Sequence, residues 1–311
     1  VFLNRMVNKL YIGVDGGGSK TRFLMMDENE NTIATAETDS TNKNSVGNDN
    51  AKKHLFDGFT ILKQHELFCD NSLKGICAGM SGVSQEKDKN LVMGWIREFF
   101  TNSPDLSISV ESDAVIGLTS GTNGIKHGIV LIAGTGSIAL GLKPNSVPIR
   151  VGGWGALFGD IGSGYWIGSE ILRIVAGSRD GVNPKTVLDS LLQDHIGKET
   201  DLLTWVYQNN EASVTWKKFA DLAPLVFKAY EQNDEAACSI IDRAIDGLYC
   251  MVKRAVELFN PEEGERITLV FVGGLLTHPD SIISVKLKNK IIESLSQIDV
   301  TLPIVSAEKA A

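Results

Sequence analysis

A carboxylate followed by three glycines is the first feature of the chain that suggests chemistry. An apolar run over residues 10–14 ends at Asp15, and a turn of Gly16, Gly17, Gly18 and Ser19 comes next. Glycine has no Cβ and takes positive φ easily, so the N–H groups of such a turn can approach phosphate oxygens closely. The spacing is not that of a Walker A loop, and the apolar residues 22–26 favour a second strand. A plain glycine-rich hairpin is therefore the alternative interpretation.

A second glycine-rich turn follows another apolar run, over residues 127–133. This turn consists of Gly134, Thr135, Gly136 and Ser137. After each of the two turns, the pattern predicts two further strands. Because both halves open with strand, glycine turn, strand and strand, the sequence indicates an internal duplication.

Two more carboxylates occupy positions that could serve a reaction or a ligand. Asp113 stands between a predicted strand and a predicted helix, where a carboxylate can act as a general base or as a helix N-cap. Asp160 lies in the glycine-dense segment 152–168, where it can form an Asx turn or contact a ligand. Trp154 in the same segment is either a core residue or a platform for a ligand.

The elements expected to position these residues alternate between strands and helices. Residues 10–120 predict β-β-β-α-β-α-β-α, with a polar loop at 39–47 and a helix from Asp49 to about Phe68. After the second glycine turn and its two strands, helices are expected at 169–177, 184–195, 202–208, 216–232 and 235–259. A strand at 267–274, a helix at 281–295 and a strand at 300–305 complete the predicted order. Such alternation is typical of an α/β fold.

Length and composition exclude several classes of protein. A chain of 311 residues is long enough for two domains, and its net charge of −8 argues against nucleic acid or an anionic membrane as a main partner. The four cysteines are scattered without a C-x-x-C pair, and the five histidines show no metal-binding spacing. With no membrane-length apolar run and no signal-peptide core, we expect a cytoplasmic protein.

Seven segments, taken in order, carry a family resemblance. They are DGGGSKT, STNKNSVG, GMSGV, ESDA, LIAGTGS, GGWGALFGDIGSGYWIG and VGGL. Together they resemble the BadF/BadG/BcrA/BcrD ATPase family of the sugar kinase, heat-shock ATPase and actin superfamily, and within it the N-acetylglucosamine kinase branch. The resemblance implies an α/β fold of two ribonuclease H-like (actin-like ATPase) domains with a cleft between them and helices added to the second domain. The expected domains are residues 7–116 and 117–311.

The resemblance also implies an activity and its ligands. It implies a kinase that uses ATP and Mg²⁺ to phosphorylate the 6-hydroxyl of N-acetylglucosamine. The expected partners are a small-molecule amino sugar and ATP, and neither nucleic acid nor a membrane. The oligomeric state stays open, with a homodimer as one option.

Individual roles follow from the same resemblance. Asp113 matches the general base, and Asp15 matches an acid that lies near the metal, usually through water. ATP binding is implied for Gly16, Gly17, Gly18, Ser19, Gly134, Thr135, Gly136, Ser137, Ala223, Gly273 and Gly274. Contact with the sugar is implied for Asn42, Asp113, Gly153, Trp154, Gly155 and Asp160. Asn44 is an alternative to Asn42, because the two lie so close in the sequence.

Three alternative functions stay open at this point. The substrate can be glucosamine or another hexosamine. An ATPase activator of a reductive dehydratase is a different class in the same family, and its cysteines hold an iron–sulfur cluster. Cys69 and Cys77 lie at a predicted helix end and in a predicted strand, and not in the loops of the second domain, where such cysteines are expected. A sugar sensor without catalysis carries an N-terminal helix-turn-helix in related families, and the sequence given has about ten residues before the first predicted strand.

The last residues predict the beginning of a helix. Ser306 is the expected N-cap, and Ala307–Ala311 form a first turn. One turn does not repay the cost of helix nucleation, so we expect that helix to continue in the native protein.

Overall fold

A computed structural model describes residues 9–311 except 19, 84, 209–211 and 279–280. The chain folds into two compact units. The first contains the residues up to Lys126 together with Pro303–Ala311, and the second is His127–Leu302. Within the described residues, no helix combines the length and the apolar character needed to cross a membrane.

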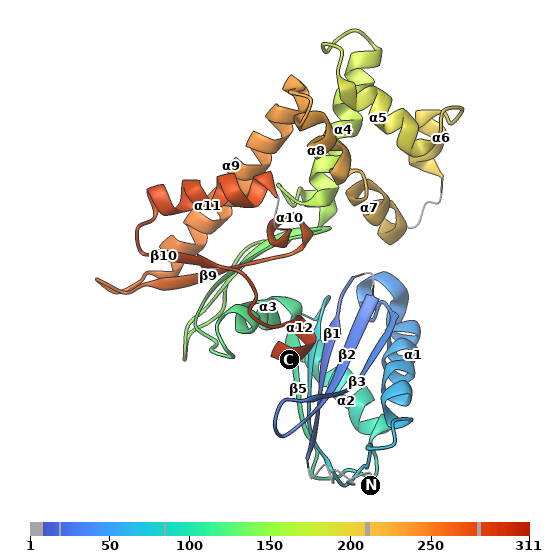
Figure 1. The fold of residues 1–311 in the computed structure, drawn as a ribbon, viewed down its shortest axis with the longest axis vertical. Helices are drawn as coiled ribbons and strands as arrows, with labels where there is room; N and C mark the ends of the chain where they lie inside the picture. Colours follow the sequence, from blue (N-terminus) through green and yellow to red (C-terminus); the bar gives the residue numbers. More distant parts are fainter. Residues whose placement is uncertain (1–8, 19, 84, 209–211, 279–280) are drawn as a thin grey trace, which may run out of the picture. The chain divides into compact units, whose positions relative to one another are not determined.

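The first unit is built on a mixed five-stranded sheet (Figure 1). Its strand order is β3 (Thr32–Asp39), β2 (Lys20–Asp27), β1 (Leu10–Gly16), β4 (Leu73–Met80) and β5 (Ser107–Ser112). The first three strands form an antiparallel meander, whereas β4 and β5 run parallel to β1. The parallel strands require helical crossovers, and the helices that supply them also cover the sheet.

The described residues of this unit form the helices α1 (Lys43–Lys63), α2 (Glu86–Phe99), α3 (Asp113–Gly121) and α12 (Ala307–Ala310). Helix α3 contacts β4, β5 and α12, all within the first unit. The division between the units therefore falls after α3, later than the boundary expected after residue 116. Helix α12 contacts β1 and α3, which brings the end of the chain into the first unit.

The start of α1 differs from the expectation of a loop over 39–47. The helix begins at Lys43, because the Asn42 side chain accepts a hydrogen bond from the Asn44 N–H at 3.0 Å and serves as its N-cap. Gly47 (φ 78°, ψ 164°) then interrupts the helix with a kink that a side chain would disfavour. The polar composition of this segment reflects a capped first turn and a break.

The second unit repeats the sheet of the first. Its strand order is β10 (Ile298–Thr301), β9 (Ile267–Val272), β6 (Gly128–Ala133), β7 (Ser137–Leu142) and β8 (Ile149–Gly152). Strands β6, β7 and β8 form the antiparallel meander, and β9 and β10 run parallel to β6. The order and directions match the first sheet strand for strand, so the duplication expected from the sequence is confirmed in the topology.

Helices are more numerous in the second unit (Figure 1). They are η1 (Ala156–Phe158), α4 (Gly164–Arg179), α5 (Val187–Ile196), α6 (Leu202–Tyr207), α7 (Ala212–Ala220), α8 (Ala223–Tyr230), α9 (Glu235–Phe259), α10 (Gly274–Thr277) and α11 (Ile282–Ser294).

Two of these helices differ from the sequence-based expectation. The single helix expected at 216–232 is split into α7 and α8, with Pro224 in the first turn of α8. Helix α4 begins five residues before the expected 169, because Ser163 accepts a hydrogen bond from the Trp166 N–H at 3.1 Å and caps it.

Each unit has its own hydrophobic core. In the first, the buried ring of Phe59 packs edge-on against Phe23 and Phe100, at centroid distances of 5.5 and 5.0 Å. In the second, α9 buries an apolar stripe at helical spacing that includes Ile240, Ala244 and Leu248. No residue is common to the two buried clusters. The α/β fold class expected from the sequence is confirmed.

Candidate active site

The carboxyl ends of β1, β4 and β5 define one edge of the first sheet. Because these strands are parallel and in register, Gly16, Met80 and Ser112 lie on adjacent strands at that edge. Ligands of open α/β sheets bind beyond the carboxyl ends of the strands. The side chains of Asp15 and Asp113 belong to this edge.

Asp113 occupies the first turn of α3 without capping it. The N-cap is Ser112, whose Oγ accepts from the Val115 N–H at 3.3 Å, so the interpretation of Asp113 as an N-cap is wrong. The Asp113 carboxylate accepts a hydrogen bond from the Ala114 N–H at 2.9 Å and another from the Ser81 hydroxyl. Burial raises the pKa of Asp113, and these hydrogen bonds act in the opposite direction. The result is an oriented carboxylate that can accept a proton.

Ser81 connects Asp113 with Asn42, the N-cap of α1. The Asn42 Nδ2 donates to Ser81 Oγ at 3.4 Å, while the Asn44 Nδ2 donates to the Gly82 carbonyl oxygen at 3.4 Å. Asn42 is partly buried and Asn44 is exposed. Asn42 and Asp113 therefore share a hydrogen-bond partner, which Asn44 does not contact. Sequence reasoning missed Ser81, although its place directly after a parallel strand is a signal that could have found it.

The first glycine turn joins antiparallel β1 and β2. The Gly17 N–H donates to the Lys20 carbonyl oxygen at 3.0 Å. A Cβ on Gly16 would stand 2.6 Å from both Met80 Sδ and Thr41 Oγ1, so this position has no room for a side chain, whereas Gly18 has open space. Ser19 lies outside the described residues. The turn is a hairpin by topology, and Gly16 is buried, Gly17 partly buried and Gly18 exposed.

Asp15 stands in an acidic surrounding that fits a cation. Burial and the charge of Glu308 raise the pKa of Asp15 to about 6, with a further rise from Asp113, whereas Arg22 lowers it. The Glu308 Oε2 is buried and has no hydrogen-bond partner among the described residues. Mg²⁺ prefers carboxylate oxygens, so these acids suit the ion that the resemblance implies.

This acidic surrounding does not form a complete metal cage. No group of three or more histidine, cysteine, aspartate or glutamate side chains in the described part of the chain is arranged to hold a metal. An ion beside Asp15 would therefore take most of its ligands from phosphate and water. Glu308 was missed by sequence reasoning, because nothing in the sequence links the last helix to β1.

In the second unit, the turn between β6 and β7 is tied to the start of α4. The Gly134 N–H donates to the Gly136 carbonyl oxygen at 3.0 Å, which closes the turn. The Gly164 N–H donates to the Gly134 carbonyl oxygen at 2.7 Å, and the Tyr165 N–H donates to the Thr135 carbonyl oxygen at 3.2 Å. The turn is thus held by backbone hydrogen bonds from the first residues of α4.

The glycines that follow β9 lie beside this turn. Gly273 has φ +95°, and a Cβ there would stand 2.4 Å from the Ala133 carbonyl oxygen and 3.0 Å from Gly134 N. Gly274 begins α10. Ser137 donates its hydroxyl to the Ile161 carbonyl oxygen at 3.0 Å. Ala223, by contrast, is 3% exposed at the start of α8 and lies in the hydrophobic core.

Asp160 connects the segment around Trp154 with the turn between β6 and β7. Its Oδ1 accepts from the Gly155 N–H at 3.1 Å, and the Ser137 N–H is a second donor. Burial raises the pKa of Asp160, and these two donors act in the opposite direction. A Cβ on Gly136 would stand 2.6 Å from Asp160 Oδ2, so the turn and the carboxylate are in close contact. Asp160 thus organises its own loop.

Trp154 is 70% exposed, with the Arg150 guanidinium 4.9 Å from the centre of its ring. Its neighbours Gly153 and Gly155 both have positive φ. The tryptophan is therefore not a core residue, and its ring is available to a ligand.

The predicted site residues thus form two groups, one in each unit. The first unit brings together Asp15, Gly16, Gly17, Asn42 and Asp113. The second brings together Gly134, Thr135, Gly136, Ser137, Gly153, Trp154, Gly155, Asp160, Gly273 and Gly274. Ala223 joins neither group.

The chain is similar to several known proteins. N-acetyl-D-glucosamine kinase of Dictyostelium discoideum is 38% identical over 304 residues, which cover 95% of this chain and 94% of that protein. N-acetylmuramic acid/N-acetylglucosamine kinase of Clostridium acetobutylicum is 30% identical and covers 87% of this chain and 86% of its own length. A crystal structure from Chromobacterium violaceum, 23% identical, covers 97% of both chains with a TM-score of 0.72 and shares the fold.

The family model itself spans almost the whole molecule. The model of the BadF/BadG/BcrA/BcrD ATPase family matches residues 12–306. This range contains every residue of both groups described above. The chain therefore belongs to the BadF/BadG/BcrA/BcrD ATPase family.

Proposed function

We propose that this protein is an ATP-dependent amino-sugar kinase that phosphorylates the 6-hydroxyl of N-acetylglucosamine. The observation that carries the proposal is the chain of contacts from Asp113 through Ser81 to Asn42. It joins a carboxylate suited to proton transfer with an amide suited to binding a sugar hydroxyl. The identity with N-acetylglucosamine kinases over most of the chain supports the same substrate.

In the proposed reaction, Asp113 accepts the proton of the sugar 6-hydroxyl while that oxygen attacks the γ-phosphorus of ATP. The bond from the γ-phosphorus to the bridging oxygen breaks, and ADP leaves. Phosphoryl transfer depends mainly on positioning and on neutralising charge, with the base orienting the nucleophile. Asp113 is fixed for this task by its two hydrogen bonds.

The glycine turns serve the nucleotide in this proposal. Gly16–Gly18 and Gly134–Ser137 would let the phosphates approach the backbone closely, while the Gly17, Gly134 and Ser137 N–H groups hold the turns in shape. Gly273 and Gly274 border the second turn. Asp15 would hold the Mg²⁺, usually through water, and the ion would neutralise charge on the phosphates. Gly153, Trp154, Gly155 and Asp160 form a loop for the amino sugar. Ala223 lies in the hydrophobic core, and its helix would form a wall beside the base of the nucleotide.

The proposed reaction indicates where the protein is located and which partners it needs. A kinase that consumes ATP and a free amino sugar belongs in the cytoplasm, and we propose that location. The protein needs no nucleic acid or membrane partner for this chemistry. Two domains remain the proposed organisation, divided after Lys126 and with Pro303–Ala311 joining the first, and a homodimer remains the proposed assembly.

A coupled assay of ADP release across a panel of hexosamines tests the function. N-acetylglucosamine should support turnover best, ahead of glucosamine and N-acetylmannosamine. Its 6-deoxy analogue is the matched control, because it lacks only the hydroxyl that is attacked. Turnover with the 6-deoxy analogue would exclude the 6-position. ATP hydrolysis that no sugar stimulates would instead favour the activator of a reductive dehydratase.

A further inference from the structure

Ser40 contacts two separate parts of the proposed site through one hydroxyl group. It follows β3 and is 6% exposed. Its Oγ donates a hydrogen bond to the Gly17 carbonyl oxygen at 3.0 Å, within the first glycine turn. The same oxygen accepts from the Asn42 N–H at 3.1 Å. Ser40 therefore couples the backbone of the glycine turn to that of the asparagine loop, residues 40–44.

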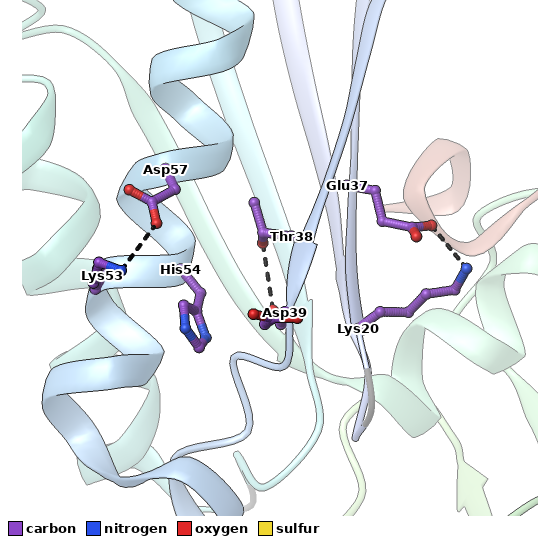
Figure 2. A pocket seen from close by; sticks show the side chains of 7 residues that line it. All are labelled: Lys20, Glu37, Thr38, Asp39, Lys53, His54 and Asp57. Carbon is purple, nitrogen blue, oxygen red and sulfur yellow. Dashed lines mark hydrogen bonds and ion pairs between the residues drawn. The ribbon is translucent and has the colours of Figure 1, made fainter.

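His54 holds the backbone of Ser40 from the neighbouring helix. The His54 Nδ1 lies 2.8 Å from the Ser40 carbonyl oxygen. A carbonyl oxygen only accepts, so Nδ1 carries the proton and donates it. Figure 2 shows His54 projecting from α1 toward the end of β3, where Asp39 lies. His54 and Asp39 line an open surface pocket of about 420 Å³.

A second contact supports the same junction. The Thr41 N–H donates to Thr21 Oγ1 at 3.1 Å, and the two threonine hydroxyls lie 2.9 Å apart. Thr41 and Thr21 are 2% and 0% exposed. Successive residues of the asparagine loop are thus bound to the β1–β2 hairpin by buried polar contacts, which specify one arrangement of the two segments.

We propose that Ser40, held by His54, is a positioning residue that sets the asparagine loop and the first glycine turn in a fixed relation. Neither residue touches the reacting atoms. Their contacts place Asn42 for the sugar and Gly17 for the nucleotide at the same time. This inference rests on the proposed function for the identity of the two ligands, but the contacts themselves do not.

Steady-state kinetics of Ser40→Ala and His54→Leu test the inference. Ser40→Ala loses both hydroxyl contacts, and the KM values for sugar and for ATP should both rise about 10-fold, while kcat falls less than about 3-fold. His54→Leu should raise both KM values about 3-fold. His54→Asn keeps a donor near the position of Nδ1 and should restore most of the loss. A change in kcat alone, with both KM values unchanged, would overturn the inference.

Two matched variants separate positioning from general destabilisation. Ser103→Ala removes another partly buried hydroxyl of the first unit, which donates to the Asp70 carbonyl oxygen at 3.2 Å. His65→Leu removes an imidazole whose Nδ1 accepts from the Leu67 N–H at 3.2 Å. Both control variants should keep the parental KM values. If they raise the KM values as much as Ser40→Ala does, the effect is not specific to Ser40.

Hydrogen exchange gives a readout that does not depend on kinase activity. The Asn42 amide is bonded to Ser40 Oγ, so a peptide over residues 39–46 should exchange faster in Ser40→Ala and in His54→Leu than in the parent and the controls. Unchanged exchange in both variants would contradict the positioning role. If the parent shows no sugar-dependent turnover but the exchange rates change as expected, the proposed function fails and the structural junction stands.

Discussion

At the scale of single residues, the site holds acids in surroundings that disfavour their charge. Asp15 shows this most clearly, because burial and the nearby charges of Glu308 and Asp113 raise its pKa from 3.8 to about 6. Such a raised pKa means that the ionised carboxylate reduces the stability of the folded protein. The protein tolerates this cost where an acid serves function.

The first prediction follows from the sign of that shift. The folded state holds the Asp15 proton more tightly than the unfolded state, so stability falls as the pH rises from about 4 through 6. Asp15→Asn should therefore be more stable than the parent at pH 7.5, by at most about 3 kcal/mol, with the gain shrinking toward pH 4. Urea unfolding without Mg²⁺ and nucleotide measures this difference.

Glu308→Gln provides the comparison for that measurement. It removes one of the charges that raise the Asp15 pKa and leaves Asp15 in place. Its gain in stability at pH 7.5 should be smaller than that of Asp15→Asn. The account of Asp15 is contradicted if Asp15→Asn is less stable than the parent at pH 7.5.

The sequence allowed part of this site to be predicted. Asp15 and Asp113 were singled out because each stands at the end of a predicted strand, and the family resemblance supplied their roles. Parallel strands bring such positions to one edge. Ser112 was missed as the cap of α3, because serine and aspartate are both good N-caps and stand side by side. The contact between Glu308 and Asp15 depends on how the last helix packs on β1, which no local pattern encodes.

At the scale of elements, close backbone contacts fix where helices lie on the first sheet. Gly13 of β1 faces α12 so closely that a Cβ would stand 1.7 Å from the Glu308 carbonyl oxygen. Backbone cannot yield as a flexible side chain can. Gly13 is therefore needed for α12 to reach its place over β1 and α3.

Gly13→Ala should displace α12 and destabilise the protein by about 1–3 kcal/mol, the usual cost of overpacking. Gly94→Ala is the matched control, because this exposed glycine in the interior of α2 has nothing within 4 Å of the added Cβ. That change should stabilise by about 0.5–1 kcal/mol through helix propensity. Urea unfolding of both variants checks the pair, and equal stabilities would refute the packing argument.

Long periodic elements were predicted better than capped or interrupted ones. The predicted bounds of α9, residues 235–259, were correct, because its apolar residues recur at helical spacing over all 25 residues without a break. The expected helix over 216–232 instead proved to be two, since periodicity carries across the short break before Pro224. The first turn of α1, before the kink at Gly47, was likewise predicted as a loop because its composition is polar.

At the scale of the whole molecule, the chain is two copies of one sheet topology with separate cores. The buried cluster of the second unit draws only on residues between Ile129 and Ile298. All strands of its sheet also come from His127–Leu302. A unit with its own sheet and core is expected to fold on its own.

A fragment of residues 127–302 should therefore unfold cooperatively in urea and show a near-ultraviolet circular dichroism signal from packed aromatic rings. The fragment should not bind the hydrophobic dye ANS as a loosely packed state does. A broad, non-cooperative transition together with strong ANS binding would show that the second unit needs the first in order to fold.

The catalytic role of Asp113 is the central claim, and Asp113→Asn tests it most directly. Asparagine keeps the size of the side chain and can still contact the sugar, but it cannot take up the proton. The kcat for N-acetylglucosamine should fall about 10²–10⁴-fold, whereas the sugar dissociation constant should change far less. Exposed Asp105, changed to Asn, is the control and should keep the parental rate. An Asp113→Asn variant that retains kcat within about threefold of the parent would contradict the claim.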